Sequence, residues 1–336
     1  MDAGTAVARL EFVEQSSAEL TGPSGSDARE RLEAQYDDVL AALEWFVENG
    51  QPDEALRLAN GLYRFWITGR HFEAGARWFD RVLDSGAGDE RLRGRAFLCA
   101  GFMPFWLGDD ERAGVLFGRA LEIGRRLNDA ALISQALGGL SRVALRTDVA
   151  KGRRLAHAAY EVSLSADDEP GISNALHLLG VGAQIAGDLL EARDWMSRRL
   201  ALVRRLGNDF LIASEASNLS MVERQLGDLA AAEALAREAL EVGERIGDQF
   251  TKPFAISGLA AIALERGEHE RAARLLGAVE AMMEAQKMEW PPDERPHYEH
   301  MLRELPVAMG ADTFDRARAS GRALSPSEAV VLALSE

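Results

Sequence analysis

The apolar residues of the chain recur every three or four positions over most of its length, with few β-branched runs between them. Between residues 187 and 206, for example, Ala192, Met196 and Leu200 share one side of a helix, whereas Glu191 and Arg198 lie elsewhere. Such spacing is typical of amphipathic α-helices. The pattern is interrupted at Gly-Asp and Gly-Glu pairs, which are typical of turns. We therefore predict an all-α chain whose units each consist of two helices joined by a short turn.

The interruptions are periodic. A small residue follows each turn at the same place in the unit, and these residues are 39 or 40 positions apart: Ala74, Ala113, Gly152, Ala192, Ala232 and Ala272. Small residues at fixed positions let helices pack closely, as in the tetratricopeptide repeat, whose usual unit is about 34 residues. We predict a tetratricopeptide-like helical-repeat superhelix of about six two-helix repeats of about 40 residues, with capping helices at both ends. The repeats are expected at 53–84, 90–127, 130–166, 170–206, 210–246 and 251–287.

The ends of the chain depart from the repeat pattern. Ser325 and Glu328, with Pro326 between them, form the sequence of a capping box and indicate the start of a last helix. We expect four segments along the chain: a flexible N-terminal segment at 1–26, an N-terminal capping helix at 27–50, the repeat array at 51–288 and a C-terminal helical cap at 289–336.

Composition narrows the range of functions. The chain has 38 Lys and Arg against 54 Asp and Glu, and this net charge of −16 argues against direct binding to nucleic acid. The single cysteine, Cys99, cannot form an internal disulfide, which fits a reducing compartment. The N-terminal residues do not resemble a signal peptide, and no apolar segment approaches the length of a membrane span. We expect a cytoplasmic protein without a nucleic-acid or membrane partner.

The sequence contains no recognisable catalytic motif. None of its three lysines follows a glycine, so the phosphate-binding loop G-x-x-x-x-G-K-[ST] is absent. His297 and His300 could bind a metal together with a carboxylate, but exposed histidines in a cap are the simpler interpretation. Cys99 lies in an apolar stretch and is interpreted as a small core residue. We predict no catalytic residues, no metal, no cofactor and no enzymatic activity.

The first helix of each repeat is expected to face a concave groove. Positions 13, 10, 6 and 3 before the turn share one side of such a helix. In the N-terminal third, which holds fourteen of the 23 aromatic residues, this rule and one adjoining residue select Tyr63, Trp66, Arg95, Phe102, Phe105 and Trp106. In the middle repeats it selects Ser134, Ser141, Asn174, His177, Gln184, Ser214, Ser217 and Arg224, with Asn218 beside them. The aromatic residues have two interpretations, as groove lining or as core between successive helices.

Two segments resemble a known family. Residues 32–45 (LEAQYDDVLAALEW) and the following ALRLA at 55–59 are similar to the start of the repeat region of certain actinobacterial regulators. Residues 271–281 (RAARLLGAVEA) and 321–325 (GRALS) are similar to the end of that region. The family comprises LuxR- and AfsR-type signal-transduction ATPases with repeats like those of the maltose regulator MalT. The resemblance implies a sensor or interaction region, here without the ATPase and DNA-binding domains.

These observations predict a non-enzymatic interaction or ligand-sensing module that works in transcriptional or biosynthetic regulation. Amide side chains in an almost uncharged groove could hold a peptide backbone, a protein segment or a small effector. One alternative is a helical-repeat enzyme or accessory protein that acts on a small or carrier-bound substrate in an aromatic pocket. The other alternative is a scaffold that self-associates, for instance as a homodimer.

Overall fold

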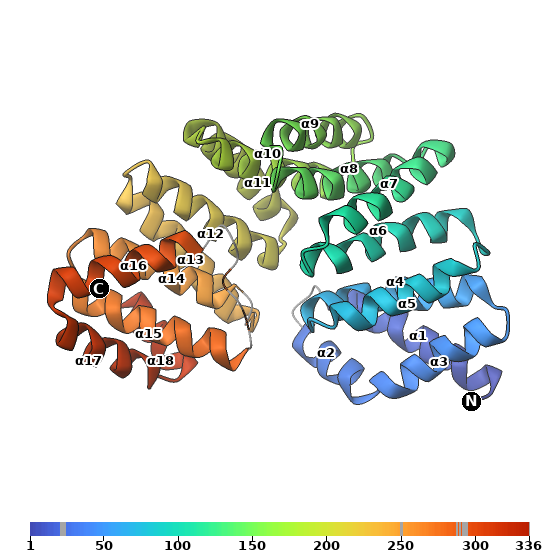
Figure 1. Cartoon of the computed structure of the whole chain (residues 1–336), viewed down its shortest axis with the longest axis horizontal. Coiled ribbons are helices and arrows are strands. Elements are labelled where there is room, and N and C mark those ends of the chain that lie inside the picture. The colour runs from blue at the N-terminus through green and yellow to red at the C-terminus, as the bar shows by residue number, and fades with distance from the viewer. Residues whose placement is uncertain (21–24, 249–250, 287, 289, 291–294, 336) are drawn as a thin grey trace. The chain divides into compact units, whose positions relative to one another are not determined.

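The computed structural model describes residues 1–20, 25–248, 251–286, 288, 290 and 295–335, which form eighteen helices and contain no strand. The chain divides into two compact units, Met1–Gly187 and Asp188–Glu336. The first unit comprises α1 (Ala3–Glu19), α2 (Gly25–Ala34), α3 (Tyr36–Glu48), α4 (Pro52–Thr68), α5 (Phe72–Asp84), α6 (Glu90–Trp106), α7 (Asp110–Leu127), α8 (Ala130–Leu145), α9 (Val149–Ser165) and α10 (Glu169–Ala186) (Figure 1). The second comprises α11 (Leu189–Leu206), α12 (Asp209–Gln225), α13 (Leu229–Arg245), α14 (Lys252–Glu265), α15 (His269–Ala285), α16 (Arg295–Met309), α17 (Ala311–Arg322) and α18 (Pro326–Leu334).

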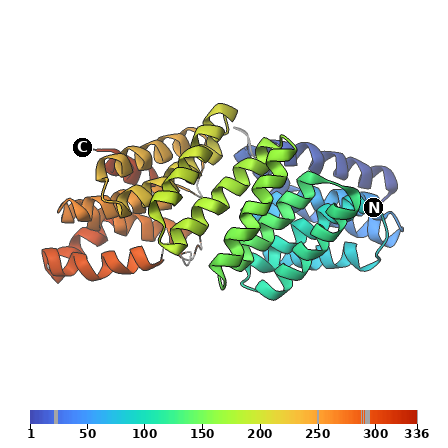
Figure 2. The same ribbon diagram turned by 90° about the horizontal axis from the view of Figure 1, so that it is seen from above.

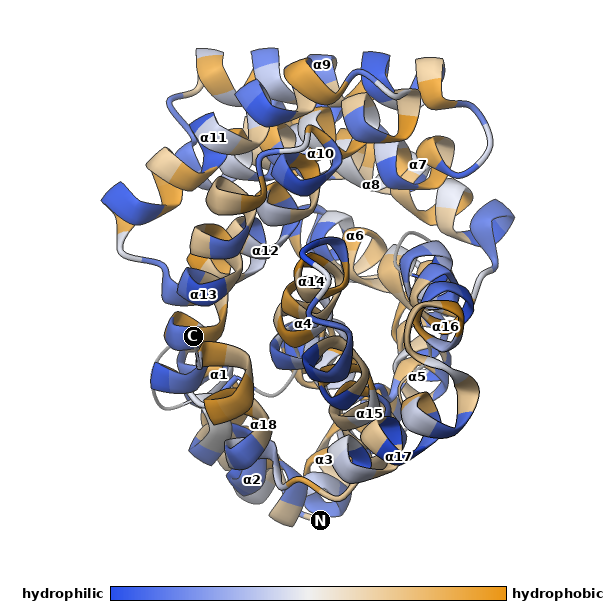
Figure 3. Cartoon of the chain, turned by 90° about the vertical axis from the view of Figure 1, so that its left-hand side faces the viewer, coloured by the Kyte–Doolittle hydropathy of each residue, from blue (hydrophilic) through white to orange (hydrophobic). Residues whose placement is uncertain are grey.

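The predicted repeats are confirmed as six successive helix pairs, from α4 and α5 to α14 and α15. Within each unit, the two helices of a repeat lie side by side, as the views from the front and from above agree (Figures 1 and 2). The helices carry both hydrophobic and hydrophilic residues (Figure 3), as expected for elements that bury one side against their neighbours. Among the described residues, no helix combines the length and the apolar character that a membrane crossing requires.

The Gly-Asp turns have a specific backbone geometry. Gly227 has φ +87°, in the left-handed region that glycine adopts without strain, and it ends α12. The next residue, Asp228, begins α13, where its side chain accepts a hydrogen bond of 3.0 Å from the backbone N–H of Ala231. Asp109 does the same for Arg112 at the start of α7. The sequence pair therefore encodes a helix stop followed directly by an N-cap.

The small residues of the repeat lie where two helices approach closely. Ala113 and Ala232 are completely buried. A Cβ atom on Gly101 would lie 2.6 Å from the ring of Phe117, and one on Gly139 would lie 2.5 Å from the same ring. The two glycines on α6 and α8 thus make room for one aromatic side chain of α7, which explains why large and small residues alternate through the array.

The N-terminus differs from the expectation. Residues 3–19 form α1 instead of a flexible segment, because Ala6, Leu10 and Val13 recur at helical spacing and are buried against the neighbouring helices. Val13 packs on Gly61 of α4. The stretch expected to be one capping helix is divided at Gln35 into α2 and α3. The division of the whole chain into the four segments stays a prediction.

The C-terminal cap is held by a very close helix crossing. A Cβ atom on Gly277 of α15 would lie 2.1 Å from the carbonyl oxygen of Arg318, and one on Gly321 of α17 would lie 1.9 Å from the carbonyl oxygen of Arg274. Both glycines belong to the segments that resemble the end of the regulator repeat region. The predicted capping box is present at the start of α18, between Ser325 and Glu328.

Candidate functional site

Two of the proposed groove residues belong to the core of the first unit. Trp66 has no exposed surface, donates a hydrogen bond of 2.8 Å from Nε1 to the hydroxyl of Tyr36, and meets Phe79 edge to face. Phe105 is 8% exposed and lies beneath the guanidinium of Arg146, 3.9 Å from its ring centroid. For these residues the interpretation as core is correct, since side chains with so little accessible surface cannot form the lining of a groove.

A shift of one residue in the turn explains the error at Trp66. The left-handed residue after α4 is Arg70, with φ +58°, and Gly69 is still right-handed. The N–H of His71 bonds to the carbonyl of Trp66, just as the N–H of Asp228 bonds to the carbonyl of Glu223. When the positions are counted back from Arg70 instead of Gly69, the side of α4 that corresponds to the groove side of the other repeats contains Arg57, Asn60, Arg64 and Ile67.

In the third repeat the positions also move one residue later, but for a different reason. The N–H of Asp148 bonds to the carbonyl of Ala144, four residues back instead of five, so the connection after α8 is one residue shorter. Ser141 is consequently buried, and its hydroxyl donates a hydrogen bond to the carbonyl of Gly152. Ser220 donates in the same way to the carbonyl of Ala232, so the two serines hold the same position in their repeats. Ser134 is also buried, with its hydroxyl 2.6 Å from that of Ser163. Gln135 and Arg142 occupy the corresponding side in their place.

We define the candidate face of the first unit as one side of α4, α6, α8 and α10, which contains the positions 13, 10, 6 and 3 before the turn that ends each helix. Its positions after correction are Arg57, Asn60, Arg64 and Ile67 on α4, Arg95, Leu98, Phe102 and Phe105 on α6, Gln135, Gly138, Arg142 and Leu145 on α8, and Asn174, His177, Val181 and Gln184 on α10. Four of these positions, Leu98, Phe105, Gly138 and Leu145, are buried and form the floor of the face. The four residues of α10, three of them predicted, are all partly exposed.

Side chains of neighbouring helices bond to one another across the candidate face. Arg95 donates to Oε1 of Gln135 at 2.8 Å, and Arg142 donates to Oδ1 of Asn174 at 2.9 Å. The Asn174 amide lies directly over Gly138, where a Cβ atom would be 2.7 Å from its nitrogen. The predicted residues Arg95 and Asn174 thus belong to rows of guanidinium and amide groups, and Gln135 and Arg142 are members that the sequence rule missed.

Aromatic residues border these rows. Tyr63 and Phe102 are partly exposed, with ring centroids 5.7 Å apart, and burial raises the pKa of the Tyr63 hydroxyl. Trp106 is 50% exposed and its ring is stacked parallel to that of Phe72 at 6.2 Å. These three residues remain available as contact surface.

The predicted residues of the second unit lie beside a small cavity. Ser217 and Arg224 line a space of about 20 Å³, together with Phe254 and His297. The guanidinium of Arg224 bonds to Glu265 and, at 3.1 Å, to Nδ1 of His297 on α16. Asn218 donates to Glu215 at 3.4 Å. His297 of α16 thus covers the Arg224 end of this side of α12, whereas Ser217 and Asn218 remain partly exposed.

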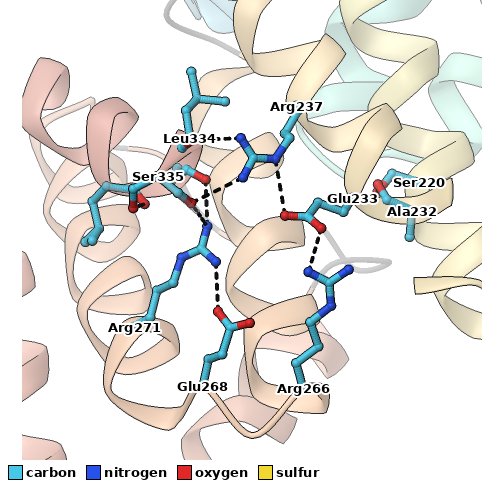
Figure 4. Close-up of polar contacts among 11 residues, drawn as sticks. Ser220, Ala232, Glu233, Arg237, Arg266, Glu268, Arg271, Leu334 and Ser335 are labelled. Carbon is cyan, nitrogen blue, oxygen red and sulfur yellow. Dashed lines mark hydrogen bonds and ion pairs between the residues drawn. The ribbon is translucent and has the colours of Figure 1, made fainter. Parts of the chain in front are cut away.

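A separate cleft of about 490 Å³ in the second unit is lined by charged residues alone (Figure 4): Glu233, Arg237, Arg266, Glu268 and Arg271. Arg237 donates to the carbonyls of Leu334 and Ser335, and Arg271 donates to those of Ala333 and Ser335. The two arginines thereby satisfy carbonyl groups that the end of α18 leaves without helical partners. The cleft thus has a structural use within the chain.

The sequence rule also missed a buried carboxylate. Glu280 of α15 is 5% exposed and accepts two hydrogen bonds of 2.7 Å from Arg318 and one of 2.8 Å from Tyr298. Burial, followed by the bond to Glu280, raises the pKa of Tyr298 to about 12. These groups come from three successive helices, α15, α16 and α17, and the packing of the cap brings them together.

The two histidines considered as metal ligands contact different partners. His297 bonds to Arg224, whereas His300 is exposed and lies 4.0 Å from Glu304. In the described part of the chain, no group of three or more His, Cys, Asp or Glu residues is arranged to hold a metal ion. Cys99 is buried, which raises the pKa of its thiol.

No family model matches the chain. Proteins of Mycobacterium bovis and Mycobacterium tuberculosis that bear the name HTH-type transcriptional regulator are 27% identical to it over 252 residues. The match covers 71% of this chain and 28% of each relative, so the chain spans little more than a quarter of the curated relatives it matches.

Several solved structures share the fold. A Rap protein complexed with competence and sporulation factor has a TM-score of 0.64 at 10% identity, over 94% of this chain and 89% of that one. NprR in complex with its cognate peptide NprX has a TM-score of 0.54 at 15% identity, over 87% and 90%. A signal-transduction ATPase with a tetratricopeptide repeat sensor, from Pyrococcus horikoshii, has a TM-score of 0.53 at 11% identity, over 96% and 55%. The chain therefore has a tetratricopeptide-like helical-repeat fold and weak sequence similarity to part of the HTH-type regulators.

Proposed function

We propose that the chain is a non-enzymatic regulatory module that binds a peptide or a protein segment on the candidate face of the first unit. The observation that carries this proposal is the pair of hydrogen bonds Arg95–Gln135 and Arg142–Asn174, which place amide and guanidinium groups in rows across neighbouring helices. An extended peptide presents backbone donors and acceptors at regular intervals, and such side chains can pair with them.

The comparisons support this proposal. Two of the solved structures that share the fold have a signalling factor or a cognate peptide as their partner, according to their names. The named relatives are transcriptional regulators, and another neighbour uses such repeats as the sensor of a signal-transduction ATPase. We therefore infer that the chain corresponds to the repeat region of a LuxR- or AfsR-type regulator and senses its partner on behalf of a DNA-binding segment.

The bordering aromatic residues fit the same role. Trp106, at 50% exposure, together with Tyr63 and Phe102, offers rigid apolar surface beside the polar rows. Recognition surfaces commonly combine such aromatic anchors with arginine. A peptide with one apolar side chain next to an exposed backbone segment would use both features.

A selection experiment tests the proposal. A phage library of random twelve-residue peptides is selected on the immobilised chain, and the enriched peptides are synthesised and titrated. We expect Asn174→Ala to weaken their binding about tenfold, because it removes one hydrogen-bonding amide and releases Arg142 from its place. The matched control is Asn208→Asp, which keeps a capping oxygen at the start of α12 and leaves the candidate face unchanged. Failure to enrich any peptide, or equal binding by the Asn174→Ala variant, would contradict the proposal.

A further inference from the structure

Two arginines on the candidate face lie near each other without a carboxylate partner. Arg64 of α4 and Arg95 of α6 are both exposed. They hold the same positions in their helices as Arg142 of α8 and Asn174 of α10, whose side chains meet at 2.9 Å. The hydrogen bond from Arg95 to Gln135 joins it to a neutral amide. Within the part of the chain that the structure describes, neither guanidinium has an ion pair with Asp or Glu.

Several other arginines on or next to the same helices pair with carboxylates. Arg57 forms a double hydrogen bond with Glu14 of α1, at 2.9 Å for each contact, and Arg146 bonds to Asp110 at 2.6 Å. Arg91 bonds to Asp129 at 2.7 Å. On the candidate face, Arg57 thus has a carboxylate partner, whereas Arg64 and Arg95 have none in the part of the chain that the structure describes.

The candidate face contains no acidic residue in any of its four helices. Tyr63, which precedes Arg64 in α4, packs its ring 5.7 Å from that of Phe102 on α6, so apolar surface adjoins this part of the face. Electrostatic attraction to an anion is stronger in such surroundings than in open water.

We propose that Arg64 and Arg95 form a subsite for a carboxylate, and that the bound peptide carries an Asp or Glu side chain there. This inference rests on the proposed function, because it names the chemistry of the same partner. A guanidinium group can donate two parallel hydrogen bonds to one carboxylate, and such charge-assisted pairs are stronger than neutral ones. The repulsion between the two arginines is relieved when the anion binds.

The selection described above also tests the subsite. We expect the enriched peptides to contain Asp or Glu at a fixed position. A synthetic copy with Asn or Gln at that position should bind about tenfold more weakly. Arg64→Gln and Arg95→Gln should each weaken the acidic peptide about tenfold more than they weaken the amide peptide. This difference, obtained from the thermodynamic cycle of residue change and peptide change, measures the carboxylate subsite alone.

Arg119→Gln is the matched control, because Arg119 is exposed on α7, away from the candidate face, and its loss changes the net charge equally. It should leave both peptides unaffected. Enriched peptides without an acidic position, or an equal loss for the acidic and the amide peptide in the arginine variants, would overturn the subsite while leaving peptide binding intact. The absence of any enriched peptide would instead overturn the proposed function and the subsite with it.

Discussion

Corresponding sides of the repeats have different surroundings in the two units. In the first unit, Arg64 and Arg95 are exposed, and Arg95 bonds to an amide of the next helix. In the second unit, Arg224 holds a similar position, but its side chain is 11% exposed and it bonds to Glu265 and to His297. One side presents its guanidinium groups to solvent, and the other has been covered by the chain's own cap.

The difference follows from the helices that come after the array. In the second unit, α16 supplies His297 against Arg224, and α16 is fixed in turn by the bond from Tyr298 to Glu280 of α15. A guanidinium group only donates, so Nδ1 of His297 must be the acceptor in this contact. The position of a residue in its repeat therefore does not by itself determine whether the residue is available for binding. It also depends on whether a helix outside the repeats, such as α16, packs over it.

The largest expected effect comes from breaking the cover. Gly321→Ala places a Cβ atom 1.9 Å from the carbonyl oxygen of Arg274. Because the nearest atoms on α15 all belong to the backbone, this clash can be relieved only if α15 and α17 move apart. We expect the free energy of unfolding to fall by about 2 to 3 kcal/mol, measured by urea denaturation. Gly118→Ala on α7, where the added atom meets open space, should not destabilise the protein. An equally stable Gly321→Ala variant would contradict the close crossing.

Alkaline pH should gradually weaken the packing of α16 on α15 and so lower the free energy of unfolding. The pKa of Tyr298 is raised to about 12 from an ordinary value of 10.0, so the folded state favours the neutral phenol. The resulting stabilisation is complete below pH 10 and is lost as the pH rises towards 12. After allowance for the partial exposure of Tyr298, we expect a loss of about 1 to 2 kcal/mol over this interval. Tyr298→Phe should remove that part of the pH dependence, and an unchanged alkaline profile in this variant would count against the interaction.

How much of this comparison could be predicted from sequence depends on the range of the interactions. Local turn chemistry, such as Gly227 followed by Asp228, repeats every 40 residues or so, and it was sufficient to locate all six helix pairs. The exact side of a helix was less secure, because a turn residue such as Arg70 can adopt the left-handed conformation that glycine usually provides. One residue of shift rotates a helix position by about 100°, which moved Trp66 from the expected groove into the core.

Long-range contacts lay beyond prediction for a different reason. The contact between Arg224 and His297 joins residues 73 positions apart, and Arg318 reaches Glu280 over 38 positions. His297 and Arg318 lie in α16 and α17, after the repeats, so the repeat pattern does not predict either contact. The resemblance at residues 271–281 and 321–325 did include Gly277 and Gly321, whose role as a helix crossing is visible only in the fold.

A smaller effect is expected at the covered arginine itself. Arg224→Gln removes the bond to Glu265 and the donor to His297, and it leaves a polar side chain in a nearly closed cavity. We expect a loss of about 1 kcal/mol in the free energy of unfolding, since Glu265 remains accessible to water and can be solvated. Hydrogen exchange of the α12 amides should accelerate in parallel. No change in either measurement would indicate that α16 does not cover this side in solution.

The smallest effect on the free energy of unfolding is expected for Arg95→Gln, the first unit's counterpart to Arg224→Gln. This substitution is the most direct test of the difference between the two units. Arg95→Gln should change the free energy of unfolding by less than about 0.5 kcal/mol, because the side chain is exposed and its bond to Gln135 can be replaced by water. A residue that is dispensable for folding but required for binding an acidic peptide is the expected signature of a recognition position. Urea denaturation of Arg95→Gln beside Arg224→Gln measures this difference directly. If Arg95→Gln destabilised the protein as much as Arg224→Gln, the exposed row would be structural, and the contrast between the two units would be lost.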